Sequence, residues 1–234
     1  MQEQHAATAF ITVQFLKSVR LFSNLSRAEI EQIKPNFFPR KYRRRETIFL
    51  KGDPCQTLYI IHTGQVKLSE ISESGREQAL LILNKGDFFD VVPIIDGGPY
   101  PTTATALSNV LLYAIYKQDF LTITSEYPVV ANAVLPYLGG IMREMADLVA
   151  DISFEGMTVR IAKLILRYAE IQGVPTPDGV LVKRTLTHQE IADILGTDRE
   201  VVTRSLIDLQ KQGVIDMKEG KQILIKDVGK LQNK

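Results

Sequence analysis

The chain has 234 residues, of which 45% are hydrophobic and 24% are charged, and its formal net charge is +1. This composition excludes a disordered chain and is long enough for one large domain or two of usual size. We expect a cytoplasmic protein, because no apolar run reaches the roughly 18 residues that cross a bilayer. In addition, the N-terminus does not read as a signal peptide, and a single cysteine, Cys55, cannot form an internal disulfide.

Glycines recur at a nearly constant interval in the first half of the chain, with gaps of 12, 11, 11 and 11 residues. They are Gly52, Gly64, Gly75, Gly86 and Gly97. Among them lie four short apolar runs: TLYII (57–61), QVKLSEI (65–71), QALLIL (78–83) and VLLYAIY (110–116). Short strands between regularly spaced turns are typical of an antiparallel sandwich or small barrel, and glycine readily adopts the positive φ of tight hairpins. We therefore predict a β-domain over residues 1–127, with helical turns around 10–34 before its strands.

Residues 128–156 have the apolar spacing of one long helix. The apolar positions are Val134, Leu138, Ile141, Met145, Leu148 and Ile152, spaced 4, 3, 4, 3 and 4. We expect the helix to be most regular from 140 to 154, because Pro136 and Gly139–Gly140 weaken its first turns. The apolar stripe either packs on the helix's own domain or forms a two-helix dimer interface. The second reading is favoured and uses Leu138, Ile141, Met145, Leu148 and Ile152.

Residues 157–234 form a third region, which carries 13 Lys and Arg against 10 Asp and Glu. A helix is predicted from Thr158 to Ile171, with Thr158 as its N-cap. GVPTPDG (173–179) reads as a loop, and a short strand and two helices follow. The region ends in a hairpin of VIDM (214–217), the turn KEGK (218–221) and QILI (222–225).

The stretch from 186 to 215, LTHQEIADILGTDREVVTRSLIDLQKQGVI, is the most specific segment of the chain. Thr187 and Glu190 form a capping box that begins one helix, and Gly196 ends it. Thr197 or Asp198 begins a second helix. The predicted buried faces are Ile191, Ile194 and Leu195 in the first helix, and Val202, Leu206 and Leu209 in the second. Two helices joined by a glycine turn indicate a helix-turn-helix, and the hairpin after them is placed to be a wing.

The exposed side of the second helix would enter the major groove of DNA. Its residues are Arg199, Glu200, Thr203 and Arg204. Arginine binds guanine O6 and N7 with two hydrogen bonds, and glutamate accepts from cytosine N4. The alternatives are local: Glu200 closes a capping box with Thr197, and Arg204 pairs with Asp208.

The start of the first of these helices is a second expected DNA contact. The backbone amides of Thr187 and His188 suit a phosphate at a helix N-terminus. His188 is a phosphate-side donor or a bystander rather than a metal ligand, because no second ligand lies nearby in the sequence.

The β-domain, the long helix and the LTHQEIADILGTDREVVTRSL segment with its wing together resemble the cyclic-AMP receptor protein / fumarate-nitrate regulator (CRP/FNR) family of bacterial transcription factors. The resemblance runs from about Phe22 to Ile225, and the phrase NKGDFF (84–89) is its other specific part. It implies an α+β chain with an N-terminal double-stranded β-helix (β-roll) like a cyclic-nucleotide-binding domain, a long dimerisation helix and a C-terminal winged helix-turn-helix.

The same resemblance implies a homodimer that binds palindromic DNA and regulates transcription, with RNA polymerase as a further partner. Arg199, Glu200 and Arg204 match the R-E-x-x-x-R pattern of members that read TGTGA-type half-sites. The half-site centres are then on the order of 10 bp apart.

In nucleotide-binding members of the family, a Glu after the GDF phrase holds the ribose and an Arg-Ser pair holds the cyclic phosphate. Here the Glu position falls at Val91 or Asp90, and the Arg-Ser position at 100–101 or 101–102, so no arginine is present. The long helix has Met145 and Ala146 where those members place hydroxyl groups. A phosphate needs a cationic or amide-rich site, so we expect no control by cyclic AMP.

The sequence does not identify an effector or show whether one exists. Residues 86–107, GDFFDVVPIIDGGPYPTTATAL, contain three Asp and no Lys, Arg or His. The candidate pocket residues are Asp90, Val91, Tyr100, Thr102, Thr103 and Met145.

The remaining motifs carry weaker signals. One cysteine excludes an iron–sulfur cluster within a single chain, His62 reads as a residue at a hairpin end, and Cys55 reads as an unreactive loop thiol. The basic run PRKYRRR (39–45) reads as a solvated strand edge, with DNA or polymerase contact as the alternative. We predict no catalysis, no cofactor, no metal and no membrane contact. The rival reading is a cyclic-nucleotide-binding module that controls a partner enzyme.

Overall fold

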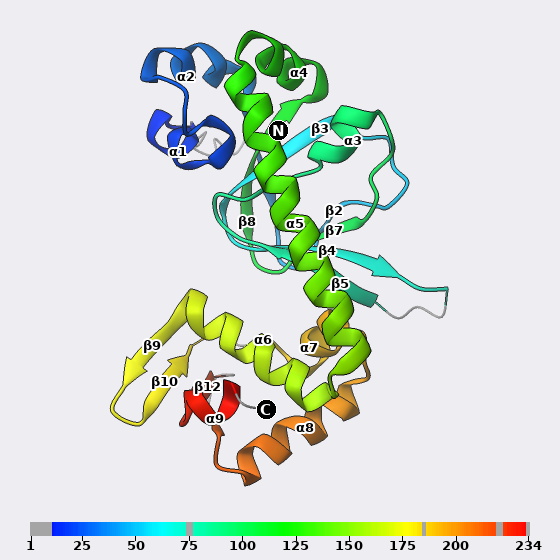
Figure 1. The fold of residues 1–234 in the computed structure, drawn as a ribbon, viewed down its shortest axis with the longest axis vertical. Helices are drawn as coiled ribbons and strands as arrows, with labels where there is room; N and C mark the ends of the chain where they lie inside the picture. The colour runs from blue at the N-terminus through cyan, green and yellow to red at the C-terminus, as the bar shows by residue number, and fades with distance from the viewer. Residues whose placement is uncertain (1–10, 74–76, 184–185, 219–221, 233–234) are drawn as a thin grey trace, which may run out of the picture. The chain divides into compact units, whose positions relative to one another are not determined.

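The structure is a computed structural model that describes residues 11–73, 77–183, 186–218 and 222–232. The chain divides into two compact units (Figure 1). The first comprises residues 1–70 and 80–145, and the second comprises residues 71–79 and 146–234. None of the described helices is both long and apolar enough to span a membrane.

Short helices precede the strands of the first unit, as predicted. They are α1 (Val13–Ser18), the 3-10 turn η1 (Arg20–Phe22), α2 (Arg27–Ile33) and the 3-10 turn η2 (Lys34–Asn36). The Ser26 side chain accepts from the Glu29 amide, and the Glu29 carboxylate accepts from the Ser26 amide. This capping box begins α2 within the predicted range.

Eight of the described strands form two four-stranded sheets, which belong to the first unit apart from residues 71 and 77–79. One sheet has the order β1 (Phe38–Tyr42), β8 (Val110–Tyr116), β3 (Thr57–Thr63), β6 (Phe88–Phe89). The other has the order β2 (Thr47–Phe49), β7 (Thr103–Ala106), β4 (Val66–Ile71), β5 (Glu77–Leu83). The four apolar runs of the sequence lie on β3, β4, β5 and β8, which confirms the predicted β-domain.

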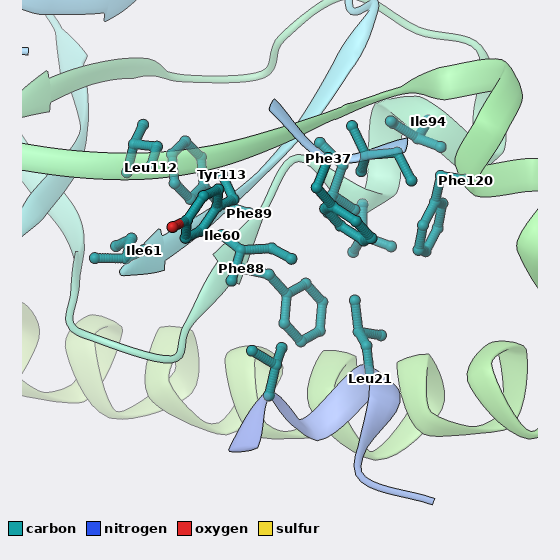
Figure 2. Close-up of a cluster of buried hydrophobic side chains, with 14 of the residues drawn as sticks. Leu21, Phe37, Ile60, Ile61, Phe88, Phe89, Ile94, Leu112, Tyr113 and Phe120 are labelled. Atoms are coloured by element: carbon teal, nitrogen blue, oxygen red, sulfur yellow. The ribbon is translucent and has the colours of Figure 1, made fainter. Parts of the chain in front are cut away.

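A single cluster of buried side chains joins these two sheets to the helices around them. Figure 2 shows aromatic and branched residues of β3, β6 and β8 packed with side chains from η1, from α3 (Val91–Asp96) and from α4 (Lys117–Glu126). Among them are Leu21, Ile60, Phe88, Ile94, Leu112 and Phe120, each at most 1% exposed. The N-terminal turns and α4 are therefore parts of the β-domain's core.

The regularly spaced glycines have the positive φ that their predicted turns require. Gly52, Gly64, Gly86 and Gly97 have φ values of 88°, 88°, 90° and 80°, and Gly75 lies outside the described residues. At Gly64 an added Cβ would lie 2.6 Å from the carbonyl oxygen of Asn109. Backbone conformation and space therefore both require glycine at position 64.

The long helix is α5 (Pro128–Phe154), 27 residues long. The helix includes Pro136, so the expectation of weak first turns was wrong. Val130, Val134 and Tyr137 are buried in this part of α5. Packing on the β-domain core offsets the backbone hydrogen bond that proline cannot make.

The second unit contains four helices and a four-stranded antiparallel sheet of order β11, β12, β10, β9. The helices are α6 (Met157–Gln172), α7 (His188–Leu195), α8 (Arg199–Lys211) and α9 (Val228–Gln232). The strands are β9 (Gly173–Thr176), β10 (Gly179–Val182), β11 (Ile215–Lys218) and β12 (Gln222–Ile225). The predicted wing thus corresponds to β11 and β12, while residues 219–221 of its turn lie outside the described residues.

Two local predictions in this unit were wrong. Helix α6 begins after Gly156 rather than at Thr158, and the Thr158 hydroxyl donates to Ser205 Oγ at 3.3 Å. Residues 173–176 form β9 rather than a loop, paired with β10. The Thr158 partner is distant in the sequence, whereas β9 pairs with β10, the next strand along the chain.

We expect Gly64→Ala to lower the free energy of unfolding by about 2–5 kcal/mol, since alanine is strained at this φ and its methyl group overlaps the Asn109 carbonyl. Gly52→Ala is the matched control, because Gly52 has the same φ and no atom within 4 Å of an added Cβ. Urea unfolding measures both, and equal losses would show that the Asn109 contact contributes nothing.

Candidate functional site

The helix-turn-helix is formed by α7 and α8. The Thr187 side chain accepts from the Glu190 amide, and the Glu190 carboxylate accepts from the Thr187 amide, which confirms the capping box. Gly196 ends α7 with φ of 64°. The six predicted buried positions of the two helices (Ile191, Ile194, Leu195, Val202, Leu206 and Leu209) are all at most 8% exposed. The sequence therefore predicted the inner faces of both helices correctly.

Three of the four predicted base-reading residues lie exposed on α8. They are Arg199, Glu200 and Arg204. The N-cap of α8 is Asp198, so Glu200 does not occupy the third helical position that a capping box with Thr197 would need. The alternative local role of Glu200 is therefore wrong, and its carboxylate lies at the surface.

Thr203 connects the two helices. Its hydroxyl donates to the Arg199 carbonyl oxygen at 2.9 Å and lies 2.9 Å from His188 Nδ1. The Thr187 amide donates to the Glu190 carboxylate at 2.8 Å. A phosphate at the start of α7 would therefore meet the amide of His188 rather than that of Thr187.

Arg160, on α6, also supports the helix-turn-helix, and the sequence reading missed it. It is 9% exposed, and its guanidinium donates to the carbonyl oxygen of Leu195 at 2.8 Å, at the end of α7. Burial lowers the pKa of Arg160, while Asp151 and Glu155 favour its charged form. The signal in the sequence was an arginine within the apolar face of a helix.

In the β-domain, Asp90 has an unusual backbone and an unusual environment. Its φ is 72°, in the left-handed region that side chains other than glycine rarely adopt. The side chain is 8% exposed, and its Oδ2 has no hydrogen-bond partner within the described part of the chain. Burial raises the pKa of Asp90 well above its usual value. Val91, the other candidate for the ribose position, is 2% exposed and begins α3.

The other candidate pocket residues contribute rings and hydroxyls. Tyr100 is buried and stacks on Phe49, with ring centroids 3.8 Å apart. Thr103 Oγ1 accepts from the Lys51 amide at 3.1 Å, whereas the buried Thr102 Oγ1 has no partner among residues that the structure describes. Met145 is partly buried against the β-domain core.

Helix α5 uses its predicted stripe only partly as a free surface. Val134 is buried, and Leu138, Ile141 and Met145 pack against the β-domain core. The large exposed apolar residues are Leu135, Met142, Val149, Ile152 and Phe154, of which Met142 is 73% and Val149 63% exposed. Packing on the helix's own domain thus accounts for part of the stripe, and the five exposed residues leave an apolar surface beside it.

Comparison with known proteins gives the family of this chain. The family model "Cyclic nucleotide-binding domain" matches residues 39–127, and "Crp-like helix-turn-helix domain" matches residues 159–234. The "Cyclic AMP receptor protein" of Thermus thermophilus is 32% identical over 88% of this chain and 92% of its own length. The chain belongs to the CRP/FNR family.

Two further relatives agree in fold and length. A "CRP-like cAMP-activated global transcriptional regulator" of Mycobacterium tuberculosis is 29% identical over 93% of this chain and 97% of its own. The structure of a putative CRP/FNR-family regulator from Eubacterium rectale matches with a TM-score of 0.74 at 23% identity, over 93% of this chain and all of the other. This CRP/FNR protein is therefore a DNA-binding transcription regulator rather than an enzyme, and the rival module that controls a partner enzyme is not favoured.

Cys55 and His62 of this CRP/FNR protein both lie in apolar surroundings. Cys55 is 4% exposed, and burial raises the pKa of its thiol, which keeps it in the less reactive protonated form. The His62 ring lies edge-on to Phe15 with centroids 4.5 Å apart, and burial lowers its pKa. These environments agree with the structural roles predicted for both residues.

The basic run belongs to β1, an end strand of its sheet, and to the turn after it. Arg40 lies over the Phe38 ring at 4.5 Å, and Lys41 and Arg43 are exposed. Charged side chains on an end strand discourage pairing between sheets, so this arrangement agrees with the solvated edge.

We expect the stability of Asp90→Asn relative to the natural protein to increase with pH. A carboxyl whose pKa is raised by folding stabilises the folded state below its unfolded pKa of about 3.9, and loses that contribution as pH rises toward the folded pKa. The difference in unfolding free energy should grow by up to about 1.4 kcal/mol per pH unit above about pH 4. Urea unfolding between about pH 4 and 8 measures it, with the exposed Asp96→Asn as control. A difference that does not change with pH would contradict a neutral Asp90.

Proposed function

We propose that this chain is a homodimeric regulator that reads a palindrome of TGTGA-type half-sites and is not controlled by cyclic AMP. It would act in the cytoplasm, together with RNA polymerase. The observation that carries the DNA-reading part is the exposure of Arg199, Glu200 and Arg204 on α8, above a fully buried inner face.

The chemistry of these three side chains fits the proposed half-site. Arg199 and Arg204 each offer a planar fork of donors that matches guanine O6 and N7, and Glu200 offers an acceptor for cytosine N4. Thr203 would help to position α8 rather than contact a base, since its hydroxyl already donates to the Arg199 carbonyl oxygen. The His188 amide, at the start of α7, would hold a phosphate.

The exposed apolar stripe of α5 supports the homodimer. Leu135, Met142 and Val149 are spaced by seven residues and are 63–73% exposed. With Leu138, Met145 and Ile152, of which the first two also pack in part against the β-domain core, they follow the a/d pattern by which two helices pack side by side. A second copy of the chain would remove this apolar surface from water. The interface proposed here differs from the one predicted from the sequence. Met142 and Val149 would lie at its centre, whereas Ile141 and Leu148 would lie at its edge.

The segment 86–107 supports the absence of control by cyclic AMP. Two relatives carry cyclic AMP in their names, but a cyclic phosphate needs a cation or a set of free amides. This segment has no Lys, Arg or His, and its Asp90 is buried. The stacked rings of Phe49 and Tyr100 add apolar surface to this region.

We expect Arg199→Ala and Arg204→Ala each to weaken binding to a TGTGA-type palindrome by about 1–3 kcal/mol, because each loses a bidentate base contact. Binding to random DNA should change much less. Fluorescence anisotropy at fixed salt measures both, with the neighbouring exposed Gln189→Ala as control.

Equal losses on both DNAs would show that these arginines contact only phosphate. The natural protein should bind the palindrome equally with and without cyclic AMP. Binding that requires cyclic AMP would overturn the effector part of the proposal, and absence of sequence-specific binding would overturn its DNA-reading part.

We expect Met142→Glu to give a monomer, because it places a charge at the centre of the proposed interface while the side chain is already exposed in the protomer. Analytical ultracentrifugation measures the mass. Asp147→Lys, on the polar side of α5, is the control and should remain dimeric. A dimer of unchanged stability for Met142→Glu would place the interface elsewhere.

A further inference from the structure

Asp90 combines two features that cost free energy in the folded protein. A non-glycine residue with positive φ is strained, and a buried carboxyl oxygen without a partner loses its hydration. Both occur at this residue. When such costs coincide at one position, they indicate a group kept for binding rather than for stability.

Four aromatic side chains of the β-domain pack against one another, and one of them directly precedes Asp90 in the chain. Phe49 stacks on Tyr100 at 3.8 Å, Tyr59 stacks on Phe89 at 5.3 Å, and Phe49 lies 6.1 Å from both Tyr59 and Phe89. These four rings form one connected group, drawn from β2, β3, β6 and the segment before β7.

Asp90 lies within electrostatic reach of this ring group. Burial is the main reason why the pKa values of the Tyr59 and Tyr100 phenols are raised, and the Asp90 carboxyl adds to the rise at both. It also adds to the rise at the Cys55 thiol, again after burial. Asp90 also directly follows Phe89, a member of the ring group, in the chain.

We propose that the effector of this regulator is an organic cation, an ammonium group held by the Asp90 carboxylate against the faces of Phe49, Tyr59, Phe89 and Tyr100. The inference rests on the proposed function, because it names the class of ligand that controls the same regulator. A carboxylate supplies the opposite charge, and aromatic faces attract cations within about 6 Å of the ring centre.

The composition of the region favours an ammonium ion over a metal ion or an anion. Calcium and magnesium require about six or more oxygen ligands, and the described residues contain no group of three His, Cys, Asp or Glu side chains placed to hold a metal. An anion would face a buried carboxyl without a compensating cation in residues 86–107.

Binding would move one side chain and one proton. The Phe49–Tyr100 stack must part to admit the ligand, and the Tyr100 hydroxyl donates a long 3.4 Å hydrogen bond to the Thr57 carbonyl oxygen. The Tyr100 backbone remains bonded to Gly52 and Asp53. Burial favours the protonated form of the Asp90 carboxyl without ligand, because it raises the pKa. A bound cation would favour the carboxylate, and the proton leaves to buffer.

Isothermal titration calorimetry of the full-length protein with methylammonium and tetramethylammonium chloride tests this inference, with sodium chloride at equal ionic strength as the reference. We expect saturable binding of at least one ammonium probe, with affinity that increases with pH and with proton release, detected as a heat that depends on the buffer's ionisation enthalpy. Asp90→Asn should weaken binding by roughly tenfold or more, since 1.4 kcal/mol corresponds to tenfold.

Asp96→Asn is the matched control, because Asp96 is an exposed acid of the same segment, and it should bind like the natural protein. Near-ultraviolet circular dichroism establishes that each variant is folded. Absence of ammonium-specific binding, or equal binding by Asp90→Asn, would overturn the inference. Binding of the TGTGA-type palindrome in the same preparations separates this failure from a failure of the proposed function.

Discussion

The packing of Tyr137 against Phe88 determines how the long helix is used. The two rings lie 3.8 Å apart, and the Tyr137 hydroxyl donates to the Phe88 carbonyl oxygen. Val130 and Val134 are buried on the same part of α5. This contact fixes the rotation of the helix about its axis, so Leu138, Ile141 and Met145 face the protein's own core while Leu135 and Met142 face outward. The apolar positions of this helix therefore divide into a packed face and an exposed face.

The same contact brings the helix to the segment where an effector would bind. Phe88 begins β6, and Asp90 follows two residues later, directly before α3. A ligand that moves Phe89 or Asp90 would act on a strand to which α5 is directly bonded. Such a ligand can shift the protein only by its difference in affinity between two arrangements, and a buried carboxyl without a partner offers that difference.

The DNA-reading helix depends on a separate set of contacts within its own unit. Arg160 holds the end of α7, the Thr187–Glu190 box holds its start, and Thr203 joins α8 to His188. Each of these side chains uses its polar group inside the protein. Arg199, Glu200 and Arg204 instead lie exposed on α8, whose inner face is buried.

The sequence by itself determined the features that depend on neighbours within a few residues. Turn glycines, the strands β3, β5 and β8, the capping box of α7 and the inner faces of the helix-turn-helix all follow from local spacing and local hydrogen bonds. The resemblance to the CRP/FNR family followed from the same local motifs. Only the tertiary structure decided the start of α6, the burial of Arg160 and the face of α5 that stays exposed. The burial of Asp90 also belongs to this group, because burial depends on which distant residues fold around a side chain.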